Sequence, residues 1–269
     1  MIGAVWGSLV RVEAIARNTF IEAARNRAFL GLGIAAVGLV VSSMVLSSLA
    51  LSDQMTRVLV DFGLFSIGLL EVIIAVVLGV ILVYKEIDRK TFYLVLPKPV
   101  RREEVLVGKL VGLLLVLAIA LAVMSAAWFL SLASRNVELR PDMVKALILV
   151  FLEAALMTST ALFFSSFATP VMSGVFTLGL FIVGRDLYLL TELLGMKKGL
   201  LASDGVARAI ATGSLAIFPD LSVFDVGKEL ILGVPVGWDY VGGAALYCLG
   251  YSVVFMALAS LAFRRRDFV

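Results

Sequence analysis

Histidine is absent from the chain of 269 residues, and cysteine occurs once, as Cys248. No disulfide can therefore form within the chain, and His-based catalysis and His/Cys metal ligation are excluded. Charged residues are also scarce, at 16% of the chain, against about 25% in an ordinary soluble domain. No basic face suited to nucleic acid is evident. We expect no metal site, no directly bound cofactor and no nucleic-acid partner.

Hydrophobic residues are correspondingly abundant. They form 61% of the chain, against roughly 45–50% in soluble domains, and the mean hydropathy is +1.07. A chain this apolar cannot present enough polar surface to water, so lipid must be its solvent. The composition predicts an integral membrane protein.

Six apolar runs are long enough to cross about 30 Å of hydrocarbon as helices. They are residues 29–51, 64–84, 110–133, 144–167, 171–194 and 241–263. We expect an all-α, polytopic, multi-pass membrane protein that forms one domain over residues 1–269. Trp6, Trp128 and Trp238 fit aromatic anchors at the membrane interfaces.

Basic residues gather on one side of these runs. Segments 1–28, 85–109 and 264–269 together carry 14 basic and seven acidic residues, whereas the opposite loops carry eight basic and ten acidic residues. The positive-inside rule places the basic side in the cytoplasm. Both termini are therefore predicted to lie inside.

Two polar segments are expected to fold on the membrane surfaces. Residues 12–28 alternate apolar and charged positions, as in an amphipathic helix lying in the cytoplasmic interface. A simple positive anchor for the first span is an equally good interpretation. Residues 191–240 are interrupted by charges such as Asp204 and Arg208, which favours short helices on the outer surface over another span.

The cytoplasmic loop over residues 85–109 combines charge with an apolar stretch. Residues 91–96 read TFYLVL, and Pro97 and Pro99 end this stretch. A loop that only enforces topology needs charge but no exposed apolar run. Apolar surface rimmed by charge commonly marks a protein contact, so we expect a docking segment here. A loop that serves topology alone is the alternative.

The order of residues in this loop resembles that in permeases of ABC transporters of the type-two exporter class. The resemblance rests on an acidic residue, a threonine, an apolar run, two prolines, a basic pair and a Gly-Lys pair, extended by the six-span plan. These residues are Glu86, Thr91, Phe92, Leu94, Pro97, Pro99, Arg101, Arg102, Glu103, Gly108 and Lys109. Lys90 stands where the family often has glycine, which affects the local turn.

The resemblance implies a permease in a prokaryotic cytoplasmic (inner) membrane, usually an exporter. It also implies that Glu86 to Val100 couples the permease to an ATPase subunit, with Arg101 to Lys109 leading back into the membrane. Two ATPase copies and a second permease copy, identical or paralogous, would complete the complex. ATP and magnesium would be bound by the ATPase.

The chain has no G-x-x-x-x-G-K-[ST] motif, because the Gly-Lys pairs at 108–109 and 227–228 lack its other positions. We therefore expect no ATPase or other enzymatic activity from this chain alone. Two other functions fit the sequence. An ion-coupled carrier or channel would use acidic groups within the spans. A membrane subunit could instead hold an extracytoplasmic partner at residues 191–240.

Four charged residues lie away from the ends of the predicted spans, in a similar layer toward the outer side. They are Glu71, Glu153, Arg185 and Asp186. Ionisable groups within a membrane are rare, face the protein interior and pair with one another. We expect Arg185 to pair with Glu71 or Glu153, inside the bundle or across a dimer, as a structural contact, as part of an outer gate or as a substrate contact. A proton relay is a further alternative.

Overall fold

The structure is a computed structural model that describes residues 2–51, 54–88, 102–187 and 218–265, and all regular structure in these ranges is helical. Two short helices lie among seven longer ones. The longer helices are α1 (Ile2–Ala24), α2 (Arg27–Leu49), α3 (Met55–Asp88), α5 (Arg102–Ser134), α6 (Pro141–Ser165), α7 (Pro170–Arg185) and α11 (Trp238–Arg265). The short ones are η1 (Leu221–Phe224) and α10 (Gly227–Leu232). The predicted all-α class is confirmed.

Five of the described helices are long and apolar enough to cross a membrane, namely α2, α3, α5, α6 and α11. The predicted fifth span, residues 171–194, corresponds in its described part to α7. This helix has 16 residues and is about 24 Å long. Residues 188–194 of that span lie outside the described residues. As predicted, short helices precede the last span, because η1 and α10 lie between α7 and α11.

Helix ends differ from the predicted ones because capping fixes them. The amphipathic segment predicted over residues 12–28 begins earlier, at Ile2, and ends at Ala24. Asn26 then caps α2, where its side-chain oxygen accepts a hydrogen bond of 3.0 Å from the backbone N–H of Ala28. The chain therefore breaks before Arg27 instead of continuing as one helix to residue 28.

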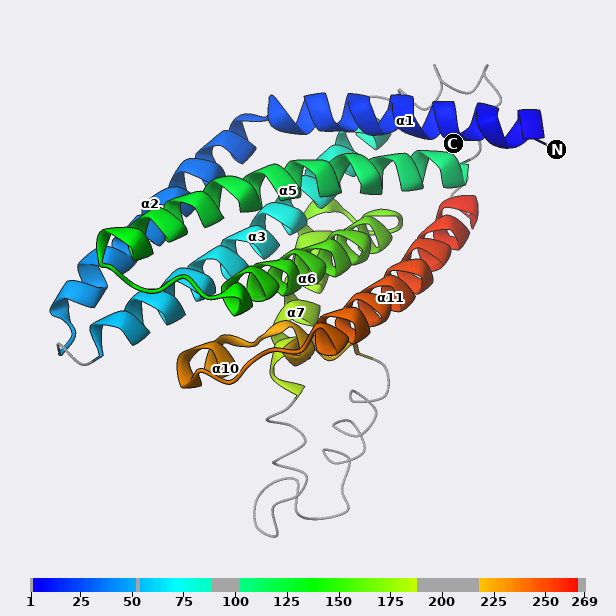
Figure 1. Ribbon diagram of the computed structural model, residues 1–269. Helices are drawn as coiled ribbons and strands as arrows, with labels where there is room; N and C mark the ends of the chain where they lie inside the picture. Colours follow the sequence, from blue (N-terminus) through cyan, green and yellow to red (C-terminus); the bar gives the residue numbers. More distant parts are fainter. Residues whose placement is uncertain (1, 52–53, 89–101, 188–217, 266–269) are drawn as a thin grey trace, which may run out of the picture.

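Helices α3 and α6 form the centre of the bundle (Figure 1). They run parallel and approach closely where α3 has glycine: a Cβ at Gly79 would lie 2.9 Å from the Cβ of Ala161, and one at Gly68 would lie 3.8 Å from Val150. Around this pair pack α2, α5, α7 and α11. Few residues of α2 and α11 are buried, as expected for lipid-facing helices.

Trp128 on α5 is part of this core, which corrects its interpretation as an interface anchor. Its side chain is fully buried, and its indole N–H donates a hydrogen bond of 3.3 Å to the carbonyl of Leu59. Gly63 makes room for the ring, because a Cβ there would lie 2.2 Å from the indole nitrogen. By contrast, Trp238 at the start of α11 is exposed, as an anchor requires.

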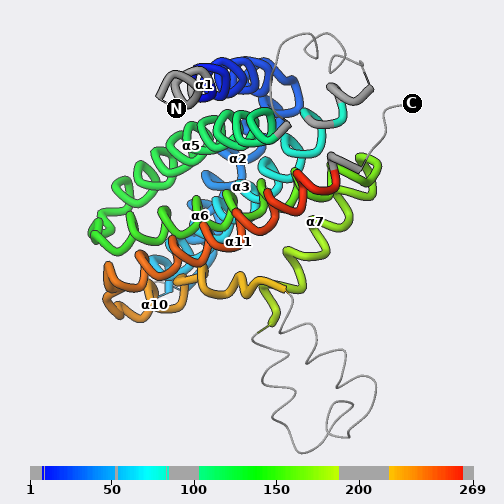
Figure 2. Tube along the Cα trace, turned by 90° about the vertical axis from the view of Figure 1, so that its right-hand side faces the viewer, coloured from blue at the N-terminus to red at the C-terminus, as the bar shows by residue number. Residues whose placement is uncertain are grey.

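Different helix ends lie at the two ends of the bundle. At one end lie the start of α1, the end of α3, the start of α5 and the end of α11 (Figure 1). We call this the termini end, and it is the end that the sequence predicts to be cytoplasmic. At the opposite, short-helix end, η1 lies beside the end of α7 (Figure 2), and α10 packs against α3 and α6. Each end gathers one group of charged side chains.

Candidate functional site

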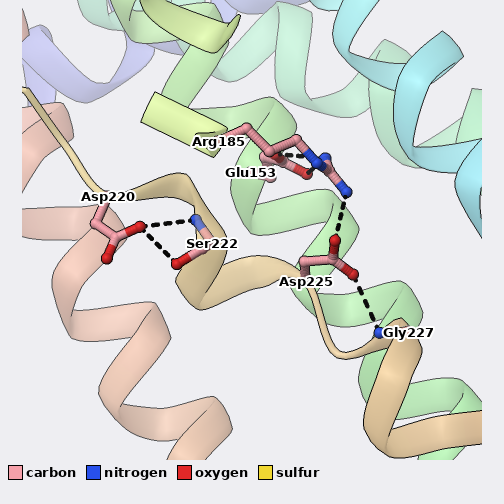
Figure 3. Close-up of polar contacts among 6 residues, drawn as sticks. All are labelled: Glu153, Arg185, Asp220, Ser222, Asp225 and Gly227. Atoms are coloured by element: carbon pink, nitrogen blue, oxygen red, sulfur yellow. Dashed lines mark hydrogen bonds and ion pairs between the residues drawn. The ribbon is translucent and has the colours of Figure 1, made fainter. Parts of the chain in front are cut away.

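Arg185 joins three elements at the short-helix end. Its Nη1 lies 3.0 Å from Oε1 and 3.2 Å from Oε2 of Glu153 on α6, and its Nη2 lies 3.0 Å from Oδ2 of Asp225, which follows η1 (Figure 3). The side chain of Glu153 is 2% exposed, that of Arg185 27% and that of Asp225 47%. The guanidinium therefore links a buried carboxylate to a carboxylate at the surface.

Local turns hold Asp225 in place. Its second oxygen accepts a hydrogen bond of 3.1 Å from the backbone N–H of Gly227, and Asp220 accepts bonds from the N–H and hydroxyl of Ser222 in the same way (Figure 3). Such aspartate turns fix short loops without a regular helix. Gly184 brings α7 against this segment, because a Cβ there would lie 2.7 Å from the carbonyl oxygen of Pro219.

A small cavity lies beside this group of charges. Its volume is about 70 Å³, and Asp61, Gly68, Glu153, Arg185 and Asp225 contribute to its lining. This space suffices for a few water molecules. In the part of the chain that the structure describes, no group of three or more acidic or cysteine side chains is arranged to hold a metal ion. The arrangement is that of an ion-pair bridge between elements.

The four predicted charges do not form one cluster. Glu71 on α3 and Glu153 on α6 lie at the same level. The two helices run parallel, Gly68 faces Val150 and Gly79 faces Ala161. The difference in residue number is the same in both pairs, and it is also the difference between Glu71 and Glu153. Glu71 is fully buried, and neither of its carboxyl oxygens has a hydrogen-bond partner. Asp186 follows the last residue of α7 and is exposed. Of the two partners considered for Arg185, the structure therefore places Glu153 against it.

A second group of contacts lies at the termini end, where α1 packs along the first half of α5. Glycines on α5 allow this close approach. A Cβ at Gly108 would lie 2.8 Å from Ile15, and one at Gly112 would lie 2.6 Å from the carbonyl oxygen of Ala16. Small residues four apart permit such helix contact. We call this contact the α1–α5 seam.

Glu104 closes the seam one turn before Gly108. Its Oε2 accepts a hydrogen bond of 2.8 Å from Nε of Arg11, and its Oε1 accepts bonds of 2.8 Å from Nη2 of Arg11 and from the hydroxyl of Ser8. The hydrogen bond to Glu104 raises the pKa of Arg11 above its ordinary value. Paired, two-point contacts of this kind fix orientation as well as distance.

Lys109 connects α5 to the end of α3. Its side chain is buried, and Nζ donates a hydrogen bond of 3.3 Å to the carbonyl of Leu82. The two helices that flank the predicted docking segment are therefore joined directly below it.

Most of the predicted docking segment lies outside the described residues. This applies to Thr91, Phe92, Leu94, Pro97, Pro99 and Arg101. Glu86 lies in the last turns of α3, and Arg102 is the first residue of α5.

Replacing Glu104 by glutamine should weaken the α1–α5 seam. The variant loses the charge that both Arg11 contacts use, so we expect the thermal midpoint in mild detergent to fall by about 3 °C. Glu13→Gln, an exposed change on α1 itself, should leave the midpoint unchanged. Equal midpoints for the two variants would show that the ion pair does not hold the seam.

Sequence reasoning missed Asp225 as a partner of Arg185, and it missed the Arg11–Glu104 pair. Asp225 does carry a local signal, because an aspartate two residues before a glycine, here Gly227, is typical of ordered turns. Asp220 precedes Ser222 in the same way. The Arg11–Glu104 pair spans 93 positions in the chain, and no local pattern indicates it.

Comparison with known proteins extends over nearly the whole chain. The model of the family described as ABC-2 family transporter protein matches residues 13–268. No curated protein matches the chain. The matched residues include Glu153, Arg185 and Asp225, the loop on which the resemblance rests and Glu104, and they begin two positions after Arg11. With its apolar helices, the chain is a multi-pass permease subunit that belongs to the ABC-2 family of transporter membrane proteins.

Proposed function

We propose that this chain is the membrane-spanning subunit of an ATP-driven exporter, and that a separate P-loop ATPase docks on residues 85–109. One observation carries the proposal beyond the family match. The docking segment is flanked by α3 and α5, which have 34 and 33 residues and are about 50 Å long. Both exceed the roughly 30 Å of hydrocarbon by several turns. They can therefore transmit a displacement at the loop into the membrane.

In the proposed topology, six spans cross the inner membrane of a prokaryote and both termini lie in the cytoplasm. Support comes from the gathering of the start of α1, the end of α3, the start of α5 and the end of α11 at one end of the bundle (Figure 1). The segments at that end carry the excess of basic residues. The predicted fifth span begins with α7, and its residues 188–194 lie outside the described residues.

The proposed mechanism starts with nucleotide-driven closure of two ATPase subunits. Closure displaces residues 86–100 and, through them, the start of α5. The α1–α5 seam makes α1 move with α5, because Glu104, Gly108 and Gly112 fix the two helices side by side. The chain's own residues bind no nucleotide in this scheme, and ATP and magnesium stay on the partner.

At the other end, the bridge from Glu153 through Arg185 to Asp225 ties α6 and α7 to the short helices. We propose that this bridge holds the outer half of the pathway closed. Breaking it would release η1 and Asp225 from α7. A second permease copy supplies the other half of the pathway, as the family resemblance implies.

A second function fits the same bridge. Asp225 belongs to the segment between α7 and α11, so movement of α6 and α7 would also reach a protein bound at residues 191–240. The chain would then transmit ATPase work to an extracytoplasmic partner without moving a substrate. An ion-coupled carrier would work without an ATPase.

Purification in mild detergent tests the proposal. We expect a P-loop ATPase to accompany the chain in equal amount, and we expect ATP hydrolysis in the preparation. An active carrier that purifies without an ATPase would contradict the proposal. An extracytoplasmic protein retained together with the ATPase, with no transport in vesicles, would favour the second function.

A further inference from the structure

An apolar groove runs between α2 and α5 on the side of the bundle. Its volume is about 400 Å³, within the usual range for small-molecule sites. Every residue that lines it is apolar or glycine. The floor is closed by Ala36 and Ile74, which are fully buried, while Ile34 and Val123 form exposed rims. The groove therefore has the polarity and shape of a site for a hydrocarbon chain.

Gly33 keeps this groove open. A Cβ at Gly33 would meet no atom within 4 Å, so this position packs against nothing in the chain. It differs in this from the glycines that serve close helix contact, such as Gly79 against Ala161. The absence of a neighbour at Gly33 means that a larger side chain would enter the groove without disturbing the helices.

Two arginines come just before Phe29, the first groove residue of α2. Arg25 and Arg27 are both exposed, and Arg27 lies two turns before Ile34 on the same stripe of α2. From Arg27 to Val37, the last groove residue of α2, the rise is about 15 Å. This length matches much of an acyl chain, with positive charge where its headgroup would be.

We propose that the groove binds one acyl chain of an anionic phospholipid, with the lipid phosphate held at Arg25 and Arg27. A basic site next to a membrane-embedded groove matches anionic lipids in charge. A second copy of the chain fits less well, because a two-fold interface uses the same patch of both subunits. It would bring two sets of these arginines toward each other with no acidic groove residue to offset them.

Native mass spectrometry of the full chain tests this site. Phosphatidylglycerol and phosphatidylcholine with identical acyl chains are titrated separately against the detergent-purified protein. We expect one tight site for phosphatidylglycerol. Replacing Arg25 and Arg27 together by glutamine should weaken it by about thirtyfold, roughly fivefold for each arginine, and leave phosphatidylcholine binding unchanged.

Gly33→Phe should fill the groove and abolish the site for both lipids. Gly38→Phe is the matched control: Gly38 lies on the same helix with no atom within 4 Å of its Cβ position, and it is outside the groove lining. It should bind both lipids as the wild type does. Equal wild-type affinity for the two lipids, or unchanged phosphatidylglycerol binding in Gly33→Phe, would overturn the proposal. Conversion of a dimer to a monomer by Gly33→Phe with lipid binding intact would assign the groove to a second copy instead.

Discussion

Replacing Arg185 by glutamine should lower the free energy of unfolding by about 3–5 kcal/mol, because it leaves the buried carboxylate of Glu153 without its counter-charge. In a chain of this size, the loss corresponds to a fall of about 10 °C in the thermal midpoint. The variant also releases Asp225 and thus the segment after η1. Thermal unfolding in mild detergent, followed by circular dichroism, measures the effect.

Three companion variants separate this bridge from a general effect of charge removal. The double variant with Glu153→Gln should recover most of the lost stability, because no buried charge remains unpaired. Glu71→Gln should change the midpoint little, since the Glu71 carboxyl has no hydrogen-bond partner to lose. Asp186→Asn should behave likewise, because Asp186 is exposed. A fall for Glu71→Gln equal to that for Arg185→Gln would show that the pairing is wrong.

Replacing Gly112 by leucine should detach α1 from the bundle. The new Cβ would lie 2.6 Å from the backbone carbonyl of Ala16 and 2.7 Å from the Cβ of Thr19, and a carbonyl within a helix cannot move aside. We expect a loss of about 3 kcal/mol or more. This loss would occur although leucine favours helix over glycine by nearly 1 kcal/mol.

Limited trypsin digestion identifies the detachment directly. In the Gly112→Leu protein, cleavage after Arg11 and Arg17 on α1 should become at least several times faster, because the helix that carries them would no longer be held against α5. Gly242→Leu on α11 is the matched control, since its Cβ position is open. Its digestion should match that of the wild type. Unchanged cleavage in Gly112→Leu would contradict the α1–α5 seam.

Hydropathy was sufficient to predict the class of fold and the approximate course of the helices. The thickness of the membrane sets how many apolar residues a spanning helix needs, so the spans could be found without tertiary information. The ends of the helices could not be predicted in this way, because they depend on single capping groups and on how far a helix projects from the membrane. Asn26 ends one helix and begins the next, and α3 continues past the predicted end at residue 84 to Asp88.

The predicted site was less complete than the predicted fold. Charge within a span showed that Arg185 needs a buried acidic partner, but Glu71 and Glu153 occupy the same level on neighbouring helices. Only packing decides between them. Trp128 illustrates the same limit: a tryptophan near a helix end fits an interface anchor, whereas the space left by Gly63 makes it a core residue. Both outcomes depend on contacts between distant parts of the chain.

Docking of a separate ATPase on the loop at residues 85–109 is measured most directly by retention of that ATPase during purification. Phe92→Asp combined with Leu94→Asp places two charges in the apolar stretch of the loop. Leu139→Asp, an exposed change in the turn between α5 and α6, is the control at the opposite end. We predict that the wild type and Leu139→Asp retain the ATPase through purification, whereas the double variant loses it with an unchanged thermal midpoint. Full retention of the ATPase and full transport by the double variant would contradict the account.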